Sequence, residues 1–253
     1  MRREGGFGWR RLAMLCLAAN VAVAMTAGPV SAAYQASVYD NRTAFTTCIG
    51  QSSTIPQSMR TMAVNAFRYL GYTPSSYEAT GFTSSTALSR AGGDQAFYVF
   101  SHGDHYYTGW GFRADGGVCN QAIVTSGQIK AKRLVSGYVK SANLVVASTC
   151  HLGETASDFP LAFGIAKLRS TPTGANHQGQ RFFLGYSGVA WTDEMYAFES
   201  KFWKSATTGS NLGDAYYYAL RNTSLLKGTA PNWWGSYTYA GVPFPPTPCY
   251  TCL

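Results

Sequence analysis

Apolar residues along the chain group into two kinds of segment. Three short runs are apolar almost throughout, which predicts strands buried on both faces; they cover 96–101, 143–148 and 181–186. Longer segments carry apolar residues at helical spacing, which predicts helices at 56–70, 85–91, 129–139, 159–168, 192–206 and 212–225. Weaker patterns predict strands at 35–39, 76–79 and 236–242 and a hairpin formed by 110–112 and 121–124.

This alternation of strands and helices indicates the fold class. Strands that alternate with helices form a mainly parallel sheet with helices packed on both faces. We therefore expect an α/β protein, a three-layer α/β/α sandwich with a mainly parallel central sheet. The carboxyl ends of parallel strands are where such folds bind ligands, so the residues after 101 and after 148 are of most interest.

Residues 1–32 stand apart from this pattern. Arginines precede an apolar run over 12–27, and small residues end the segment at Ala32. This order is typical of a secretory signal peptide, so we expect cleavage after Ala32 and a secreted, extracellular protein. The alternative is a permanent membrane anchor, but the apolar run is short for a span of about 20 residues and Pro29 ends it.

The segment 33–253 has the length of one ordinary domain, with a tail rich in proline and cysteine at 243–253. No other stretch is apolar enough to span a membrane, so we expect no membrane contact once the leader is removed. The whole chain has a formal net charge of +8, but its lysines and arginines form no cluster. Nucleic-acid binding requires such clustering, so nucleic acid is not an expected partner.

The cysteines of the mature chain are odd in number. They are Cys48, Cys119, Cys150, Cys249 and Cys252. In a secreted protein an odd count leaves one thiol unpaired. Cys150 ends a strongly apolar strand and is the natural unpaired residue, whereas the other four are candidates for disulfides. Cys249 and Cys252 are close enough in sequence to pair with each other, but the sequence does not fix the pairing.

Two of the predicted buried strands run into polar residues that suit nucleophilic catalysis. The strand at 96–101 leads into His102 and Gly103, and the strand at 143–148 leads through Thr149 to Cys150. A thiol needs a base or a positive neighbour to ionise near neutral pH, and His102 would supply it. Gly103 has no side chain, so its amide, with that of Cys150, is suited to an oxyanion hole.

This order of motifs resembles the superfamily of cysteine peptidases that contains caspases, metacaspases, legumain and gingipains. An apolar strand that ends in His-Gly precedes a second that ends in Cys, at a spacing close to the roughly 50 residues seen in caspases. The CHLG at 150–153 is similar to the CHSG of metacaspases, and the FFLGYSGVAW at 182–191 is similar to a later strand of these peptidases. The resemblance covers roughly 55–225.

The resemblance implies a caspase-like fold and a cysteine endopeptidase that acts on peptides or proteins. Calcium assists some members of the superfamily, but the sequence assigns no ligands for it, and we expect no cofactor. By position it implies Cys150 as nucleophile, His102 as general acid and base, and the amides of Gly103 and Cys150 as oxyanion donors. The reaction would pass through a thioester acyl-enzyme. His105 and His151 are the competing bases, which we interpret as loop residues that shape the cleft.

The chain departs from the metacaspase pattern at the substrate pocket. Ser148 stands where metacaspases carry an acid that selects arginine or lysine. Asp193 or Glu194, just after the third buried strand, would supply that charge instead, with Trp191 as a wall of the pocket. Both acids can equally be interpreted as helix-start residues that interact with the helix dipole.

One alternative function is a zinc-dependent hydrolase. The run FSHGDH matches the HxHxDH run of metallo-β-lactamases, except that Phe100 replaces the first histidine. Possible ligands are His102, Asp104, His105, Cys150 and His151. Because the first ligand is missing and His177 is the remaining histidine, we do not expect a metal site.

A second alternative is a secreted binding module without catalytic activity. Several aromatic residues near the C-terminus would then form a binding surface: Tyr216, Tyr217, Tyr218, Trp233 and Trp234. The same residues can equally be interpreted as core packing, with the tyrosines on one face of a helix and the tryptophans in a C-terminal segment that covers the core. The presence of both His102 and Cys150 favours the enzyme.

Overall fold

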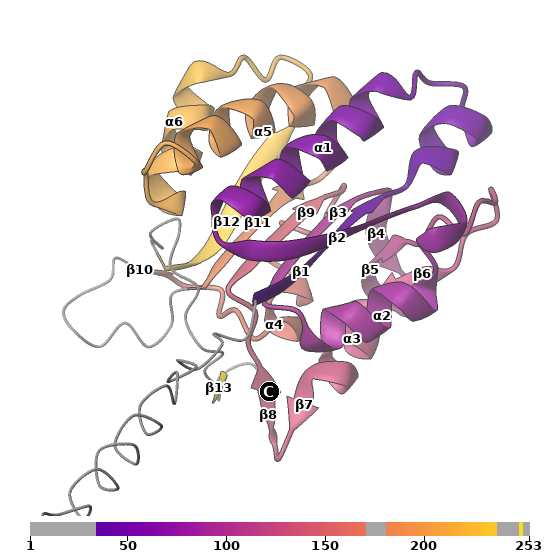
Figure 1. Cartoon of the computed structure of the whole chain (residues 1–253), viewed down its shortest axis with the longest axis vertical. Coiled ribbons are helices and arrows are strands. Elements are labelled where there is room, and N and C mark those ends of the chain that lie inside the picture. The colour runs from indigo at the N-terminus through magenta and orange to yellow at the C-terminus, as the bar shows by residue number, and fades with distance from the viewer. Residues whose placement is uncertain (1–33, 171–180, 237–247, 250–253) are drawn as a thin grey trace, which may run out of the picture. The chain divides into compact units, whose positions relative to one another are not determined.

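The computed structural model describes residues 34–170, 181–236 and 248–249, and its centre is a seven-stranded sheet (Figure 1). The strand order is β10-β12-β11-β9-β3-β1-β2. Neighbouring strands are parallel except for β12, which runs antiparallel to β11. The bounds are Tyr34–Asp40 (β1), Tyr72–Glu78 (β2), Ala96–Phe100 (β3), Leu144–Ser148 (β9), Arg169–Ser170 (β10), Phe182–Ser187 (β11) and Ala230–Ser236 (β12).

Helices cover both faces of this sheet (Figure 1). One layer holds α1 (Thr54–Tyr69), α5 (Thr192–Ala206) and α6 (Leu212–Asn222), and the other holds α2 (Ser84–Gly93), α3 (Ser126–Arg133) and α4 (Phe159–Ala162). Alternate residues of a strand point to opposite faces, so Tyr98 packs in the first layer and Phe97 in the second. The predicted three-layer α/β/α sandwich with a mainly parallel sheet is confirmed.

Two small antiparallel sheets lie outside the central one. β4 (Gly103–Tyr106), β5 (Gly109–Arg113) and β6 (Ile123–Thr125) follow directly from β3. The predicted hairpin is thus confirmed as β5 and β6, whereas β4 was not predicted. The other small sheet joins β7 (Leu134–Val135), β8 (Tyr138–Lys140) and β13 (Pro248–Cys249).

Most predicted elements are present, but three predicted helices extend too far. The smallest of these three overruns is that of the helix predicted at 212–225, which ends at Asn222. The prediction of helix over 129–139 is wrong beyond Arg133, where the chain forms the β7–β8 hairpin instead. Ser136 and Gly137 both have positive φ, as a two-residue hairpin turn of type I′ requires. The helix predicted at 159–168 ends at Ala162, because Gly164 takes the left-handed conformation that terminates helices.

The last strand of the sheet begins earlier than predicted. It is β12, Ala230–Ser236, whereas the prediction placed it at 236–242, of which 237–242 lie outside the described residues. Proline inside an apolar run argues against a central strand, so the presence of Pro231 made this strand hard to predict from the sequence. The burial of Trp233 opposite Leu184 fixes the strand against β11.

The leader and most of the tail lie outside the described residues, so cleavage after Ala32 stays a prediction. The small connecting helices are a short π-helix at Ala44–Cys48 and a 3-10 turn at Ala79–Gly81. Within the described residues no helix has the length and apolar character needed to cross a membrane.

Candidate active site

The carboxyl ends of β3 and β9 bring His102 and Cys150 to the same edge of the sheet. The two strands are parallel neighbours, with Phe100 opposite Ser148, and the Ser101 amide extends the pairing by donating to the Ser148 carbonyl at 3.3 Å. Cys150 packs against the core on the α1 and α5 face. The His102 ring stacks on Phe45 of that same core, with ring centroids 4.7 Å apart. The predicted adjacency of the two strands is confirmed.

Gly103 permits an unusually close approach between the two strand ends. A Cβ atom at this position would lie 2.7 Å from the Cys150 carbonyl oxygen and 2.7 Å from the Thr149 Cβ. Real Cβ atoms do not approach neighbours so closely, so glycine is the residue that fits here. The backbone after His102 therefore lies directly against the backbone that carries the thiol.

A sharp turn follows Cys150. His151 has a φ of +65°, a conformation that side-chain-bearing residues rarely adopt. Its amide donates to the Gly188 carbonyl at 2.9 Å, and the Gly153 amide donates to the Tyr186 carbonyl at 2.8 Å. A Cβ at Gly153 would lie 2.6 Å from the backbone of Gly185 and of Tyr186. The loop that holds Cys150 is thus fastened to the end of β11.

The Cys150 thiol is half-buried, and no disulfide involves it. Its Sγ lies 3.3 Å from the Ala190 amide, which donates to it, and 3.7 Å from the Ala190 carbonyl, which accepts from it. Burial raises the pKa of the thiol above its ordinary value, the Asp104 carboxylate adds to the rise, and the Ala190 hydrogen bond opposes it. The resting thiol is therefore protonated at neutral pH.

His102 is shifted in the direction that keeps it neutral. Burial lowers the pKa of its imidazole below the ordinary value, and the Arg113 guanidinium lowers it further. Among the hydrogen bonds of the described residues, none joins the His102 ring to the Cys150 Sγ. A protonated thiol and a neutral imidazole at the same edge of the sheet suit a base that removes the proton when a substrate is in place.

The competing histidines have other partners. The His105 ring packs on Trp110 with centroids 4.7 Å apart, and the His151 Nδ1 lies 2.5 Å from the Glu154 Oε1. The zinc alternative gains no support, since within the described part of the chain no three His, Cys, Asp or Glu side chains form a group that could hold a metal ion. His177 lies outside the described residues.

Ser148 does not line an open pocket, which corrects the prediction from sequence. Its side chain is fully buried and its hydroxyl donates to the Oε1 of Glu199, a residue of α5. Tyr98 and Tyr186 also donate to this carboxylate, at 3.0 and 2.9 Å. Burial raises the pKa of Glu199 to about 7, and these hydroxyl hydrogen bonds oppose the rise.

The other predicted pocket residues hold a neighbouring segment, 227–229. The Trp191 Nε1 donates to the Lys227 carbonyl at 3.1 Å. Glu194 is buried and accepts from the Lys227 amide at 2.7 Å and the Thr229 amide at 3.1 Å, whereas Asp193 is exposed and forms an ion pair with Lys227. Glu194 therefore has a structural partner for each oxygen, and its role as a selecting charge is not supported.

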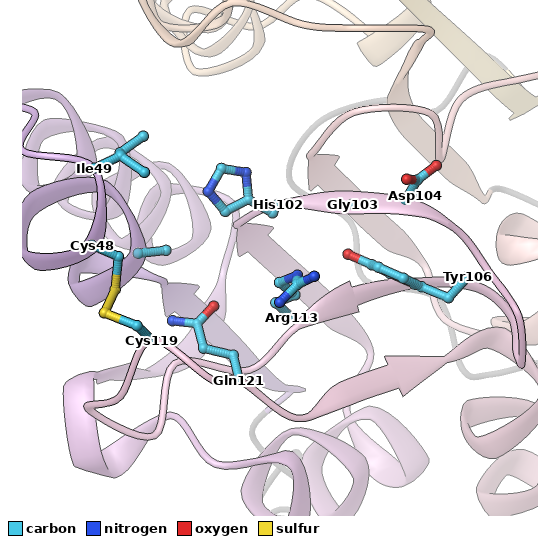
Figure 2. A pocket seen from close by; sticks show the side chains of 10 residues that line it. Cys48, Ile49, His102, Gly103, Asp104, Tyr106, Arg113, Cys119 and Gln121 are labelled. Atoms are coloured by element: carbon cyan, nitrogen blue, oxygen red, sulfur yellow. A yellow bond between two sulfur atoms is a disulfide. The ribbon is translucent and has the colours of Figure 1, made fainter.

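An open cavity of about 390 Å³ lies next to His102 (Figure 2). Its lining comes from the segment after β1, the strand β4, and the stretch from β5 to Gln121; the residues are Ala44, Cys48, Ile49, His102, Gly103, Asp104, Tyr106, Arg113, Cys119 and Gln121. Sequence reasoning missed the role of Arg113 and Gln121, because only the folding of the β4–β6 sheet brings them beside His102.

One wall of this cavity is a disulfide between Cys48 and Cys119 (Figure 2). The prediction that Cys150 is the unpaired thiol is thereby supported, because two of the other candidates pair with each other. Cys252 and the side chain of Cys249 lie outside the described residues.

Comparison with known proteins yields fold similarity alone. The chain matches no family model and no curated protein sequence. Among solved structures it is similar to the initiator caspase Dronc of Drosophila, at 10% identity over 80% of this chain and 81% of that chain, with a TM-score of 0.45. It is also similar to protein GSU0716 of Geobacter sulfurreducens, at 14% identity over 83% of this chain and 94% of that chain, with a TM-score of 0.43.

The aromatic residues of the binding-module alternative do not form one exposed surface. Tyr216 and Trp233 are buried in the core beside α5, and Tyr217 and Trp234 are partly buried against the two cores. The expectation of an aromatic binding surface is therefore wrong, and the core-packing interpretation holds for most of these residues.

Proposed function

We propose that this protein is a secreted cysteine endopeptidase in which Cys150 is the nucleophile and His102 the general acid and base. One observation carries the proposal: the ends of two adjacent parallel strands hold an unpaired thiol and an imidazole at one edge of the sheet. The close approach of Gly103 to the Cys150 carbonyl supports it, because a backbone amide beside a nucleophile is what an oxyanion hole requires.

The reaction follows from these groups. His102 accepts the proton of the Cys150 thiol as Sγ attacks the substrate carbonyl carbon, and the amides of Gly103 and Cys150 stabilise the resulting oxyanion. The carbon–nitrogen bond then breaks as the leaving nitrogen takes the proton from His102, which leaves a thioester. Water attacks the thioester, gives a proton to His102, and the carbon–sulfur bond breaks as Cys150 regains its proton.

The electrostatics of the pair suit this sequence of steps. A lowered pKa keeps His102 unprotonated and able to accept a proton at neutral pH. The nearby Arg113 guanidinium makes the imidazolium a stronger acid, so it gives the proton to the leaving nitrogen more readily.

Secretion is supported by the disulfide. Disulfides persist in oxidising compartments and are rare in the cytosol, so the Cys48–Cys119 bond fits a protein that is exported. The leader predicted at 1–32 would direct that export. The amino-terminal residue of the protein recovered from culture medium tests this directly, and we expect it to be Ala33.

A mixed peptide library tests the activity. The purified mature protein should cut peptides, and Cys150→Ala and His102→Gln should each lower the rate by at least 1,000-fold, on the scale seen for removal of catalytic dyad members. His105→Ala is the matched control, because this exposed histidine packs on Trp110 outside the pair and should leave the rate unchanged. Identical product profiles for the wild type and Cys150→Ala would refute the proposal.

Alkylation of Cys150 tests the resting state of the thiol. Because burial raises the pKa of this thiol, the rate of its reaction with iodoacetamide should still be rising above pH 8.5. The rate is measured by mass spectrometry of the peptide that contains Cys150 after brief exposure at a series of pH values. A plateau already reached at pH 7 would mean a thiolate–imidazolium pair at rest and would contradict our description of the site.

A further inference from the structure

The cavity beside His102 lies on one particular side of the catalytic pair. Along the sheet the order is β11, β9, β3, β1, so His102, which follows β3, stands between Cys150 and the segment that follows β1. Every lining residue belongs to the segments 44–49, 102–106 or 113–121. None belongs to the loops after β9 or β11, which hold the Cys150 thiol and its partner Ala190.

This placement identifies the part of a substrate that reaches the cavity. In the proposed reaction the acyl carbon is bound to Cys150, and the leaving nitrogen takes its proton from His102. The acyl part therefore lies toward Ala190, and the leaving part lies on the other side of His102. The open volume on that side is the cavity, and its size is within the usual range of about 300–1,000 Å³ for ligand sites.

The cavity contains a guanidinium without an acidic partner. Arg113 makes no ion pair with any carboxylate in the parts of the chain that the structure describes. Its partner in the lining is the neutral Tyr106, to which it makes a side-chain hydrogen bond and whose ring centroid lies 5.7 Å from the guanidinium carbon. The backbone of Arg113 is fixed, because its carbonyl accepts from the Ser101 hydroxyl at 2.6 Å and from the Asn41 side chain at 3.2 Å. Figure 2 shows its side chain in the middle of the lining residues.

The other polar groups of the lining are already engaged. The side-chain amide of Gln121 exchanges two hydrogen bonds of 2.7 Å with that of Asn41. Asp104 is exposed and lies away from the disulfide end of the cavity in Figure 2, and its Oδ1 accepts from the His105 amide at 2.7 Å. Arg113 has five donors, so its hydrogen bond to Tyr106 leaves others for a ligand, and a guanidinium binds carboxylates in a two-point geometry.

We propose that this cavity is the leaving-group subsite and that Arg113 binds a carboxylate there, so that the protein prefers substrates whose first residue after the cut bond carries a negative charge. The inference rests on the proposed peptidase function and adds the class of substrate. The carboxylate is either an acidic side chain or the free α-carboxylate of a terminal residue, and the two are separated by experiment.

A peptide set with one fixed acyl part tests the preference. Four leaving parts are compared: glutamate amide, glutamine amide, lysine amide, and glutamine with a free α-carboxylate. We expect the wild type to cut at least one carboxylate-bearing peptide ten or more times faster than glutamine amide, because hydrogen bonds to charged groups are the strong ones. Faster cleavage of glutamate amide identifies the side chain as the source, and faster cleavage of the free acid identifies the terminus.

Variants of Arg113 connect the preference to the cavity. Arg113→Gln should abolish the rate ratio between carboxylate-bearing and neutral peptides, and Arg113→Lys should retain part of it because the positive charge remains. Arg68→Gln, an exposed arginine in the last turn of α1, is the matched control and should keep the full ratio. An unchanged ratio in Arg113→Gln, or equal rates for all four peptides in the wild type, would overturn the inference.

A binding measurement separates failure of the inference from failure of the proposed function. In the Cys150→Ala protein the His102 ring is followed by NMR against pH, with N-acetylglutamate or N-acetylglutamine amide added. The charged groups around His102 are Arg113 on β5 and Asp104 on β4, and the titratable but neutral Tyr106 lies beside them on β4. N-acetylglutamate should raise the pKa of His102, because its carboxylate offsets the positive charge of Arg113. This rise should be absent in the double variant Cys150→Ala, Arg113→Gln. If no peptide is cut but the rise is present, the peptidase proposal fails and carboxylate binding stands; no rise overturns the inference.

Discussion

The two sides of the proposed catalytic edge differ in how fully their polar groups are engaged. On the Cys150 side the thiol contacts the Ala190 backbone, Ser148 donates to the buried Glu199, and Glu194 accepts from two backbone amides. On the His102 side an open cavity holds Arg113, which has no carboxylate partner within the described residues. The polar groups of the first side are engaged within the fold, whereas the second side holds the cavity that we propose receives a ligand.

This difference helps to distinguish charged side chains that support the fold from those that are free to bind a ligand. A buried charge that already accepts or donates every hydrogen bond it can make has no capacity left for a substrate. Glu194 and Glu199 each accept hydrogen bonds within the fold on both carboxylate oxygens; the sequence suggested Glu194 as a selecting charge and did not point to Glu199. Arg113 has five donors and lines an open cavity, and this is why we propose that recognition occurs on the His102 side.

Removal of the disulfide should have the largest effect and should fall on the His102 side. Cys48 and Cys119 are 71 residues apart, and closing a loop of that length in the unfolded chain is worth about 4 kcal/mol in the chain-entropy account. We expect the double variant Cys48→Ser, Cys119→Ser to lose about that much free energy of unfolding, measured by urea denaturation.

The same double variant also tests whether the two sides are independent. Its Cys150 should react with iodoacetamide at the wild-type rate, because the loop that holds Cys150 is fastened to Gly188 and Tyr186 and not to the disulfide. The preference for a negatively charged leaving part should decrease, since the disulfide is a wall of the cavity. A changed alkylation rate with an unchanged preference would reverse our assignment of the two sides.

Gly103→Ala should have the next largest effect, because Gly103 lies where the two sides meet. The added Cβ would lie 2.7 Å from the Cys150 carbonyl oxygen, which forces the two strand ends apart. A displacement of about 1 Å at a catalytic site costs on the order of 100-fold in rate, and overpacking costs about 1–3 kcal/mol of stability. Steady-state kinetics and urea denaturation measure both.

The control for this change is Gly93→Ala at the end of α2. Nothing lies within 4 Å of the Cβ added there, and alanine is favoured over glycine in helices by about 0.5–1 kcal/mol. Activity should be unchanged and stability equal to or slightly above that of the wild type. Equal losses in the two variants would mean that Gly103 has no special part in the site.

The sequence allowed the framework of the site to be predicted, because local patterns determine it. Continuous apolar runs identified β3 and β9, and the rule that ligands bind at the carboxyl ends of parallel strands then pointed to His102 and Cys150. The odd cysteine count pointed to Cys150 as the unpaired thiol. These inferences need only the order of residues along the chain.

The residues that line the cavity were missed because long-range packing brings them together. Arg113 and Cys48 are far apart in sequence, and only the return of the β4–β6 sheet and the disulfide bring both to the cavity beside His102. The buried acid Glu199 was overlooked although it left a local signal. It lies on the apolar stripe of α5 between Met195 and Trp203, and an acid at a core position of a helix requires buried partners.

Glu199 on the Cys150 side should make the protein less stable as pH rises. Its pKa in the folded protein is about 7, above the ordinary value of 4.5, so between these values the folded state binds more protons than the unfolded state. Stability from this group is fully present below about pH 4.5 and is lost as pH rises through 7, at up to about 1.4 kcal/mol per pH unit.

The Glu199→Gln variant isolates this contribution. Glutamine does not titrate, so the variant should show a smaller fall in the free energy of unfolding between pH 4.5 and 7.5 than the wild type. Asp40, whose burial raises its pKa to about 7, contributes a similar fall in both proteins and cancels from the difference. Parallel stability curves for the two proteins would show that Glu199 is ionised in the fold at all these pH values.

The smallest effect is expected at the exposed rim of the Cys150 side. Asp193 and Lys227 form an ion pair of 2.5 Å, but half of each side chain is exposed, and exposed pairs contribute about 0.2–1 kcal/mol. Asp193→Asn should therefore change stability by no more than about 0.5 kcal/mol and should leave the choice of peptides unchanged. The choice of peptides is measured by profiling Asp193→Asn and Lys227→Gln against the same peptide library. If Asp193→Asn abolished a preference for arginine or lysine before the cut bond, the acid would be a selecting residue, and the contrast between a supporting side and a recognising side would no longer hold.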